Sequence, residues 1–558
     1  MLAKSSFSLT KAFLAILFFT FIFAMNFFMQ NPGNSGLTLP FNTTTWLSIS
    51  IALGIGLFYI AKQQKLKYDQ FSLGLLLVCI LLTIPLFYST ALFDEALARI
   101  VGLWAGWLFT LVLQQFSFKQ KHINFLLVTL LISVLIQATF SYVQFLLLEP
   151  GNIFAYNVNR SVPYGIFQQT NVLASFLATG IPLSAYLLGS QYSNHRHIRK
   201  LLYIAPLIVI PVLIILSSRT GWLVALISFS FCLPWLYQNL NKSQFTKWLT
   251  SIFSACILGY VLLVNVNNAT LERLEYKTKL SDIRSSMYAQ SLDMIKDKPL
   301  LGYGYGRYEA QYMHFTAKQH QLNPEYKPGL ANTDHPHNEI LLWVVEGGIV
   351  STIAVMLVLY LVVKQLMLVD KYKRFILIAL LTPIGLHSQL ELPFYHSAVH
   401  WLFLLIFLFI VNYNTHKTST IALPNFSLLL LRVSSLLLPL VTISYMLSTL
   451  YTNIILTRFE ATRPIDVKIL EKITNHTTWR HRIEWDVNIT KLKIGIATKN
   501  HDLINQYITW SLELIKYQPR PAIYQNLISA YKEINQPEKA TEIVKQARYL
   551  FPDRELKY

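Results

Sequence analysis

Two histidines in one short polar segment are the side chains of this chain best suited to acid–base chemistry. They lie in the run His335-Pro336-His337-Asn338, which closes the polar stretch 266–339 between two apolar regions. An imidazole titrates near neutral pH and can therefore act as a general base. Ionisable side chains at a membrane–water boundary usually line a substrate path or take part in chemistry, because burying them is costly. We therefore expect the active site here.

Spacing alone leaves three interpretations of the histidine pair open. Asn338 precedes the apolar run that starts at Ile340, so it could cap a helix with the histidines incidental. One histidine could be a catalytic base. Both could bind a cation, although a zinc site requires three or four ligands with further support.

Other polar residues are expected on the same side of the membrane. Arg284 lies within the long loop itself, and Gln169, Arg219, Glu391 and Tyr395 lie at the ends of apolar runs. Arginines in a partly dry site bind phosphate through paired donors and keep their charge. A base beside fixed positive charge suits attack by a hydroxyl on an anomeric carbon that carries a pyrophosphate leaving group. Glu391 and Tyr395 could equally be anchors and caps at a span end.

Two further segments have simpler interpretations. Gly302-Tyr303-Gly304-Tyr305-Gly306 resembles a phosphate loop only superficially, because it lacks the Gly-Lys-Ser/Thr ending and a preceding strand. We expect a turn. Asp94-Glu95 offers two adjacent carboxylates that a metal could use, but a solvated pair at the membrane boundary is the simpler expectation.

The elements that must position these residues are membrane helices. The chain has 558 residues, of which 53% are apolar and only 13% charged, whereas soluble proteins carry about 25% charged residues. Apolar runs of about 18 residues or more predict about 13 spans in an all-α polytopic fold. They lie near 11–29, 45–61, 71–92, 100–116, 123–147, 171–189, 201–217, 221–238, 248–265, 340–363, 375–392, 399–413 and 426–450.

Basic residues set the expected orientation. One set of short loops is rich in lysine and arginine, whereas the opposite short loops hold only Arg99, Arg160 and Arg219. By the positive-inside rule the N-terminus is cytoplasmic and the 266–339 loop faces the periplasm of a bacterial inner membrane. The net charge of +19 follows largely from this bias. No basic patch on a folded surface indicates nucleic-acid binding, so membrane lipid is the expected anionic partner.

The composition becomes amphipathic after about residue 455. Pro519 and Pro552 end two helical units and lie 33 residues apart, close to the tetratricopeptide period of about 34. We therefore predict four regions. They are N-terminal spans in 1–265, a large periplasmic loop in 266–339, C-terminal spans in 340–453 and a tetratricopeptide-like helical region in 454–558.

Four motifs in this order resemble the bacterial O-antigen ligase and polymerase superfamily, and most closely its protein O-oligosaccharyltransferase branch, which has a GT-C-like membrane fold. The motifs are Gly165-x3-Gln169-x-Asn171, Ser218-Arg219-Thr220-Gly221-Trp222, Arg284 followed by Pro299-Leu300-Leu301-Gly302, and His335-Pro336-His337-Asn338 followed by Glu346-Gly347-Gly348.

The resemblance implies a role for each matching residue. His337 would be the catalytic base, and Arg219 and Arg284 would contact the undecaprenyl pyrophosphate. Gln169 and Tyr395 would be further site residues, with His335 and Glu391 nearby candidates. The implied reaction is an inverting transfer that requires no metal and no cofactor.

The predicted function is transfer of a preassembled oligosaccharide from a lipid-linked donor to serine or threonine of a periplasmic protein, with pilin-like acceptors plausible. An O-antigen ligase or polymerase with a sugar acceptor is an alternative. A lipid-linked-sugar flippase is another, although transporters place charged residues near the membrane midplane.

Overall fold

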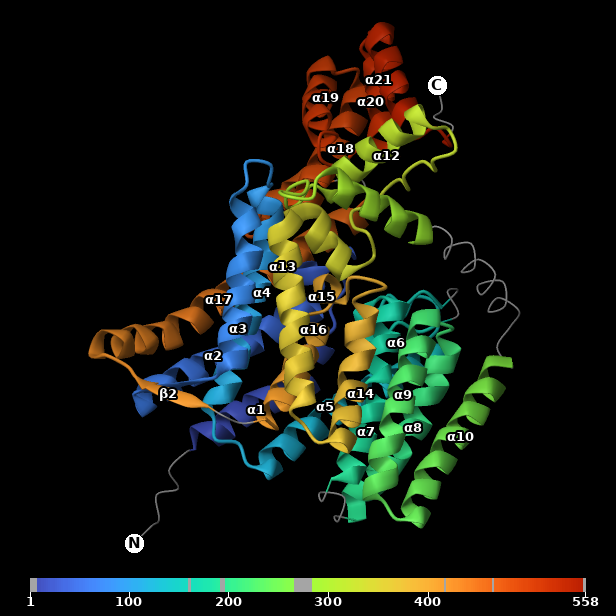
Figure 1. Ribbon diagram of the computed structural model, residues 1–558. Coiled ribbons are helices and arrows are strands. Elements are labelled where there is room, and N and C mark those ends of the chain that lie inside the picture. Colours follow the sequence, from blue (N-terminus) through green and yellow to red (C-terminus); the bar gives the residue numbers. More distant parts are fainter. Residues whose placement is uncertain are drawn as a thin grey trace. The chain divides into compact units, whose positions relative to one another are not determined.

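The computed structural model describes residues 8–158, 162–190, 196–264, 284–415, 418–463 and 466–554. Arg160 and the first part of the predicted loop, 266–283, lie outside these residues. The fold is all-α and multi-pass, as predicted, and helices carry most of the chain (Figure 1). In the described part, sheet is limited to a two-stranded antiparallel pair, β1 (Lys65–Tyr68) with β2 (Ser419–Ala422), in which Lys65 faces Ala422.

Each of the predicted spans lies on helical structure, because long apolar runs satisfy their backbone polar groups within a helix. Eleven spans of the described residues are long and apolar enough to cross a membrane. Helices α14 and α16 contain 17 and 16 residues and are shorter than these. The helices are α1 (Leu9–Ile22), α2 (Pro40–Gln63), α3 (Gln70–Thr83), α4 (Phe93–Gln115), α5 (Gln120–Leu146), α6 (Thr170–Ala178), α7 (Gly180–Gly189), α8 (Arg196–Ile215), α9 (Arg219–Asn239), α10 (Lys242–Val264), α13 (Glu339–Met367), α14 (Lys371–His387), α16 (Ala398–Tyr413) and α17 (Asn425–Ala461).

Shorter elements and the polar helices complete the chain. The short elements are α15 (Pro393–His396) and the 3-10 turns η1 (Ala24–Asn26), η2 (Gly36–Thr38), η3 (Ile84–Phe87), η5 (Gly165–Phe167) and η7 (Val467–Lys472). The polar helices are 284–297, α12 (Tyr308–Leu322), α18 (Arg480–Thr498), α19 (His501–Leu514), α20 (Pro521–Glu533) and α21 (Pro537–Leu550).

The chain divides into two compact units. The first contains the described residues of 1–76, 103–275 and 358–478, and the second those of 77–102, 276–357 and 479–558. This division cuts across α3, α4 and α13, so each unit includes parts of membrane helices.

The first unit packs its helices through small residues. Helix α17 lies along α2, where a side chain at Gly54 would come within 2.6 Å of the Pro439 ring. Helices α8 and α10 pair, as do α9 and α14. The predicted span 171–189 is confirmed as one candidate membrane span, Thr170–Gly189. It contains two helices, α6 and α7, separated only by Thr179, which keeps helical dihedral angles. Both halves are almost completely buried, so this span lies in the centre of its unit.

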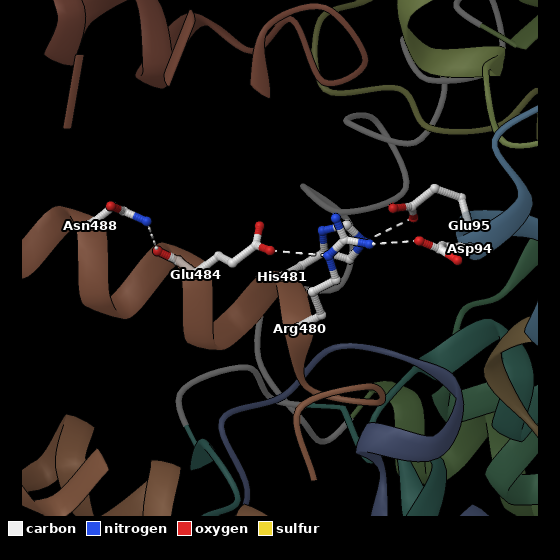
Figure 2. A network of polar contacts seen from close by, with 6 residues as sticks. All are labelled: Asp94, Glu95, Arg480, His481, Glu484 and Asn488. Atoms are coloured by element: carbon white, nitrogen blue, oxygen red, sulfur yellow. Dashed lines mark hydrogen bonds and ion pairs between the residues drawn. The ribbon is translucent and has the colours of Figure 1, made fainter. Parts of the chain in front are cut away.

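The second unit joins segments that are far apart in the sequence. Arg520, at the N-cap of α20, donates two hydrogen bonds to the Glu309 carboxylate of α12, at 2.7 and 2.8 Å. Figure 2 shows a second junction, in which Arg480 and His481 at the start of α18 contact Asp94 and Glu95 in the first turn of α4. The Asp94-Glu95 pair is therefore bound to basic side chains of the C-terminal region.

The C-terminal region consists of two helical hairpins, α18–α19 and α20–α21, which also pack on each other through α19 and α20. Ala540 and Ala547 are buried where α21 meets α20. Helix α12 packs against α21 within the same unit (Figure 1). The relation of the C-terminal region to tetratricopeptide repeats stays a prediction.

Candidate active site

The loop before α13 holds His337 in an unusual backbone conformation. Its φ is +50°, in the left-handed region that residues other than glycine rarely adopt. The His337 N–H donates to Nδ1 of His335 at 3.1 Å, and the two imidazole rings meet edge to face with centroids 4.4 Å apart. Asn338 then caps α13, as predicted, by accepting the Leu341 N–H at 2.9 Å.

A second element holds the same loop from the other side. The hydroxyl of Tyr288, in helix 284–297, donates to the His337 carbonyl at 3.0 Å. Arg284 is the first described residue of this helix, one turn before Tyr288. The helix therefore connects one predicted phosphate ligand to the predicted base. Both histidines and both of these helix residues belong to the second unit.

The glycine-rich segment is a turn, as predicted, with a structural role behind this loop. Gly302, Gly304 and Gly306 all have positive φ. Helix α13 is interrupted at Gly348 (φ +61°), and the Tyr303 and Gly304 N–H groups donate to the carbonyls of Val345 and Glu346 at this break, both at 2.9 Å. The turn therefore satisfies the carbonyls that the interrupted helix leaves open.

A buried ion pair lies next to this break. The Glu346 carboxylate accepts a hydrogen bond from Arg99 at 2.7 Å and another from the Tyr308 N–H at 3.1 Å. The Arg99 guanidinium also lies 4.3 Å from the ring centroids of Tyr305 and Trp343. In the sequence, Arg99 is a lone arginine at the start of an apolar run, which indicates a need for a buried partner but does not identify Glu346.

In the first unit, the glutamine motif and the arginine turn meet. Ser218 is the N-cap of α9: its hydroxyl accepts the Gly221 N–H at 3.1 Å and donates to the Asn171 side chain at 2.9 Å. A side chain at Gly221 would approach Ala174 to 2.5 Å, so glycine permits close contact between α6 and α9. Gln169, the N-cap of α6, and Arg219, the first residue of α9, are thus placed at two adjoining helix ends.

Amide side chains of α5 hold the loop that leads into the glutamine motif. Gln144 Oε1 accepts the N–H groups of Tyr164 and Gly165 at 3.1 and 2.8 Å, and Gln137 Oε1 accepts that of Ile166 at 2.9 Å. A side chain at Gly165 (φ +60°) would come within 2.7 Å of Gln137 Oε1. The loop is therefore fixed by neutral groups, which are less costly than charges inside a membrane.

The Glu391–His396 segment is linked to the same motif. His396 donates from Nε2 to the Phe167 carbonyl at 2.6 Å, two residues before Gln169. Burial lowers the pKa of His396, although this hydrogen bond and the nearby Glu391 favour its protonated form. Glu391 is buried, and its N–H donates to the carbonyl of His387. Tyr395 lies in the single turn of α15, beside the Gly36 backbone.

The predicted site residues therefore form two sets. His335, His337 and Arg284 are connected within the second unit, whereas Gln169, Arg219, Glu391 and Tyr395 are connected within the first. Among the described residues, no group of three histidine, cysteine, aspartate or glutamate side chains could hold a metal ion. The role of Tyr288 was not predicted from the sequence, because this residue is 49 positions from its partner His337.

Three protein families match successive parts of this chain. Residues 163–188 match the protein glycosylation ligase family, and residues 204–356 match the O-antigen ligase family. Residues 375–558 match the C-terminal part of the virulence factor membrane-bound polymerases. No curated protein matches the chain.

The fold and these matches define a multi-pass membrane enzyme of the ligase type, which transfers glycans. The chain belongs to the O-antigen ligase superfamily. Gln169 lies within the first match, Arg219, Arg284, His335 and His337 within the second, and Glu391 and Tyr395 within the third.

Proposed function

We propose that this enzyme transfers a preassembled oligosaccharide from undecaprenyl pyrophosphate to a serine or threonine hydroxyl of a periplasmic protein. The match of residues 163–188 to the protein glycosylation ligases is the observation that favours a protein acceptor. The proposal places the enzyme in a bacterial inner membrane with a cytoplasmic N-terminus and a periplasmic site. Pilin-like proteins are suitable acceptors.

In the proposed reaction His337 removes the proton from the acceptor hydroxyl. The oxygen attacks the anomeric carbon from the face opposite the pyrophosphate, so the new glycosidic bond forms with inversion. The bond between that carbon and the pyrophosphate oxygen breaks, and the lipid pyrophosphate leaves with the bonding electrons. We assign stabilisation of its negative charge to Arg284 and Arg219. The proton on His337 is then released to water, which completes the balance.

The test replaces His337 with alanine and compares glycosylation of a coexpressed acceptor by glycopeptide mass spectrometry. Transfer should fall by at least about 100-fold, as expected when a general base is lost. Equal amounts of both proteins in the membrane fraction control for folding. An H337A variant as active as the wild type would refute the assignment.

The match of residues 204–356 to the O-antigen ligases favours a second candidate, in which the same donor reacts with a sugar acceptor. Deletion of the gene separates the two functions. Loss of glycoprotein with an intact lipopolysaccharide ladder supports a protein acceptor, and the reverse pattern supports the sugar acceptor. Turnover of donor and acceptor by purified enzyme in detergent, where no gradient exists, would exclude transport as the essential activity.

A further inference from the structure

The backbone of His337 is the starting point, because its conformation needs external support. A left-handed residue other than glycine is strained, and such residues persist only where their surroundings hold them. The φ of His337 is +50°. Both of its backbone polar groups are bound by side chains: His335 accepts from its N–H, and Tyr288 donates to its carbonyl.

The contact with His335 defines which of that residue's nitrogens carries hydrogen. A backbone N–H can only donate, so Nδ1 of His335 must accept and cannot be protonated. The proton of a neutral His335 is then on Nε2, which faces the Asp334 carboxylate at 3.5 Å. An acceptor on residue 335 bound to the N–H two positions later reproduces the hydrogen bond of an Asx turn, which asparagine or aspartate normally makes.

The contact with Tyr288 links this turn to a rigid element. Tyr288 lies within helix 284–297, so its hydroxyl fixes the His337 carbonyl relative to the helix that carries Arg284. On the next turn of the helix, Ser291 bonds to the hydroxyl of Tyr308 at 2.9 Å. The helix is therefore bound to α12 through Tyr308 and to the loop before α13 through Tyr288.

We propose that His335 and Tyr288 are positioning residues, which hold the imidazole of His337 in its reactive orientation through its backbone. His335 acts as an Asx-turn acceptor, and it is neither a second base nor a metal ligand. This inference rests on the proposed role of His337 as the base. It predicts that position 335 needs only a hydrogen-bond acceptor for the His337 N–H, which the side-chain amide of asparagine can supply.

The first experiment compares Tyr288→Phe with Tyr308→Phe in purified enzyme. Tyr288→Phe removes the hydroxyl that bonds to the His337 carbonyl, and Tyr308→Phe removes the hydroxyl that bonds to Ser291 of helix 284–297. Tyr288→Phe should lower kcat about 10- to 100-fold, the size expected when a catalytic group is misplaced, with little change in the KM for the lipid-linked donor. Tyr308→Phe removes a support of the helix but leaves the His337 carbonyl bound, so its loss of kcat should be at least about fivefold smaller than that of Tyr288→Phe. Equal losses in the two variants would overturn the role of Tyr288.

The second experiment compares His335→Ala with His335→Asn. Alanine removes the acceptor and should lower kcat about 10- to 100-fold. Asparagine restores the acceptor and should recover most of that loss, to within about fivefold of the wild type. If asparagine is as inactive as alanine, His335 needs its imidazole and the proposal fails.

Wild-type and H337A enzymes run in the same assay separate this inference from the proposed function. If these two do not differ, His337 is not the base and the proposed function fails. If they differ while Tyr288→Phe matches Tyr308→Phe and His335→Asn matches His335→Ala, the positioning roles alone are refuted. Thermal denaturation of every variant identifies any loss that comes from unfolding.

Discussion

The two units satisfy their buried polar groups in different ways. In the second unit, the buried carboxylates Glu309 and Glu346 each bind an arginine from a distant part of the sequence. In the first unit, the membrane helices are joined by neutral groups, such as the hydroxyls of Thr20 and Ser48 at 2.6 Å, and the buried carboxylate of Glu391 lies outside these helices, near His396. A buried carboxylate needs a counter-charge, whereas a neutral group needs only a hydrogen bond. Assembly of the second unit therefore depends more strongly on charge.

The largest effect should come from removing one charge of a buried pair. Arg99→Ala leaves the Glu346 carboxylate buried without its guanidinium, since the arginine and glutamate side chains are only 8% and 3% exposed. We expect a loss of about 3–5 kcal/mol, measured as a lower midpoint of thermal denaturation in detergent.

Arg480→Ala is the matched control, because the side chains of Arg480 and Asp94 are 45% and 76% exposed. Its cost should be about 1 kcal/mol or less. Similar losses in the two variants would contradict the distinction between buried and exposed pairs.

An intermediate effect is expected in the neutral network of the first unit. The Ser175 hydroxyl lies 2.6 Å from Nδ1 of His387 and 3.1 Å from Nε2 of His400, and all three residues are fully buried. Ser175→Ala should cost about 1–3 kcal/mol, because it removes a hydrogen-bonding partner from two buried imidazoles.

Ser230→Ala serves as the control for this prediction. Its hydroxyl bonds only within its own exposed helical turn, to the Leu226 carbonyl at 2.9 Å, so denaturation should barely change. An S175A variant as stable as S230A would show that the buried network contributes little.

The smallest effect concerns pH at the junction in Figure 2. The hydrogen bond with Glu95 raises the pKa of His481; the nearby Glu484 has the same effect, while burial and Arg480 oppose it. A raised pKa stabilises the folded state fully below the unfolded value of about 6.5, and this contribution is lost as pH rises through the raised value.

The wild type should therefore lose up to about 0.5 kcal/mol between about pH 6 and pH 8.5, since His481 is 43% exposed and solvent screens the pair. For a chain of this length this corresponds to a fall of about 0.5 °C in Tm. The His481→Gln variant should lack this part of the pH dependence. An identical slope in both proteins would rule out His481 as its source.

The sequence predicted the membrane helices well, because a long apolar run in lipid must form a helix to satisfy its own backbone hydrogen bonds. It also predicted that Asn338 caps α13 and that Gly302–Gly306 is a turn, since both depend on local chemistry. Within the span 171–189, the separation of α6 from α7 by the single residue Thr179 was not predicted, because Thr179-Gly180 lies inside a continuous apolar pattern.

The supports of the candidate site were not predictable from one sequence. Tyr288 reaches His337 across 49 positions, and Arg99 reaches Glu346 across 247. Local spacing contains no information about such contacts, which arise only when the helices pack. The resemblance to a family supplied the expected roles of the matching residues, but not the side chains that hold them.

The ion pair between Glu309 and Arg520 has a consequence for membrane topology. Two bonded residues lie on the same side of a bilayer, so the chain between them crosses it an even number of times. Helices α13 and α17 are both candidate membrane spans by length and hydropathy. Helices α14 and α16 pack together and span roughly 24–26 Å at 1.5 Å per residue, less than the ~30 Å of a typical hydrocarbon core. If α13 and α17 cross, these two short helices must either both cross, with the bilayer thinned around them, or both turn back.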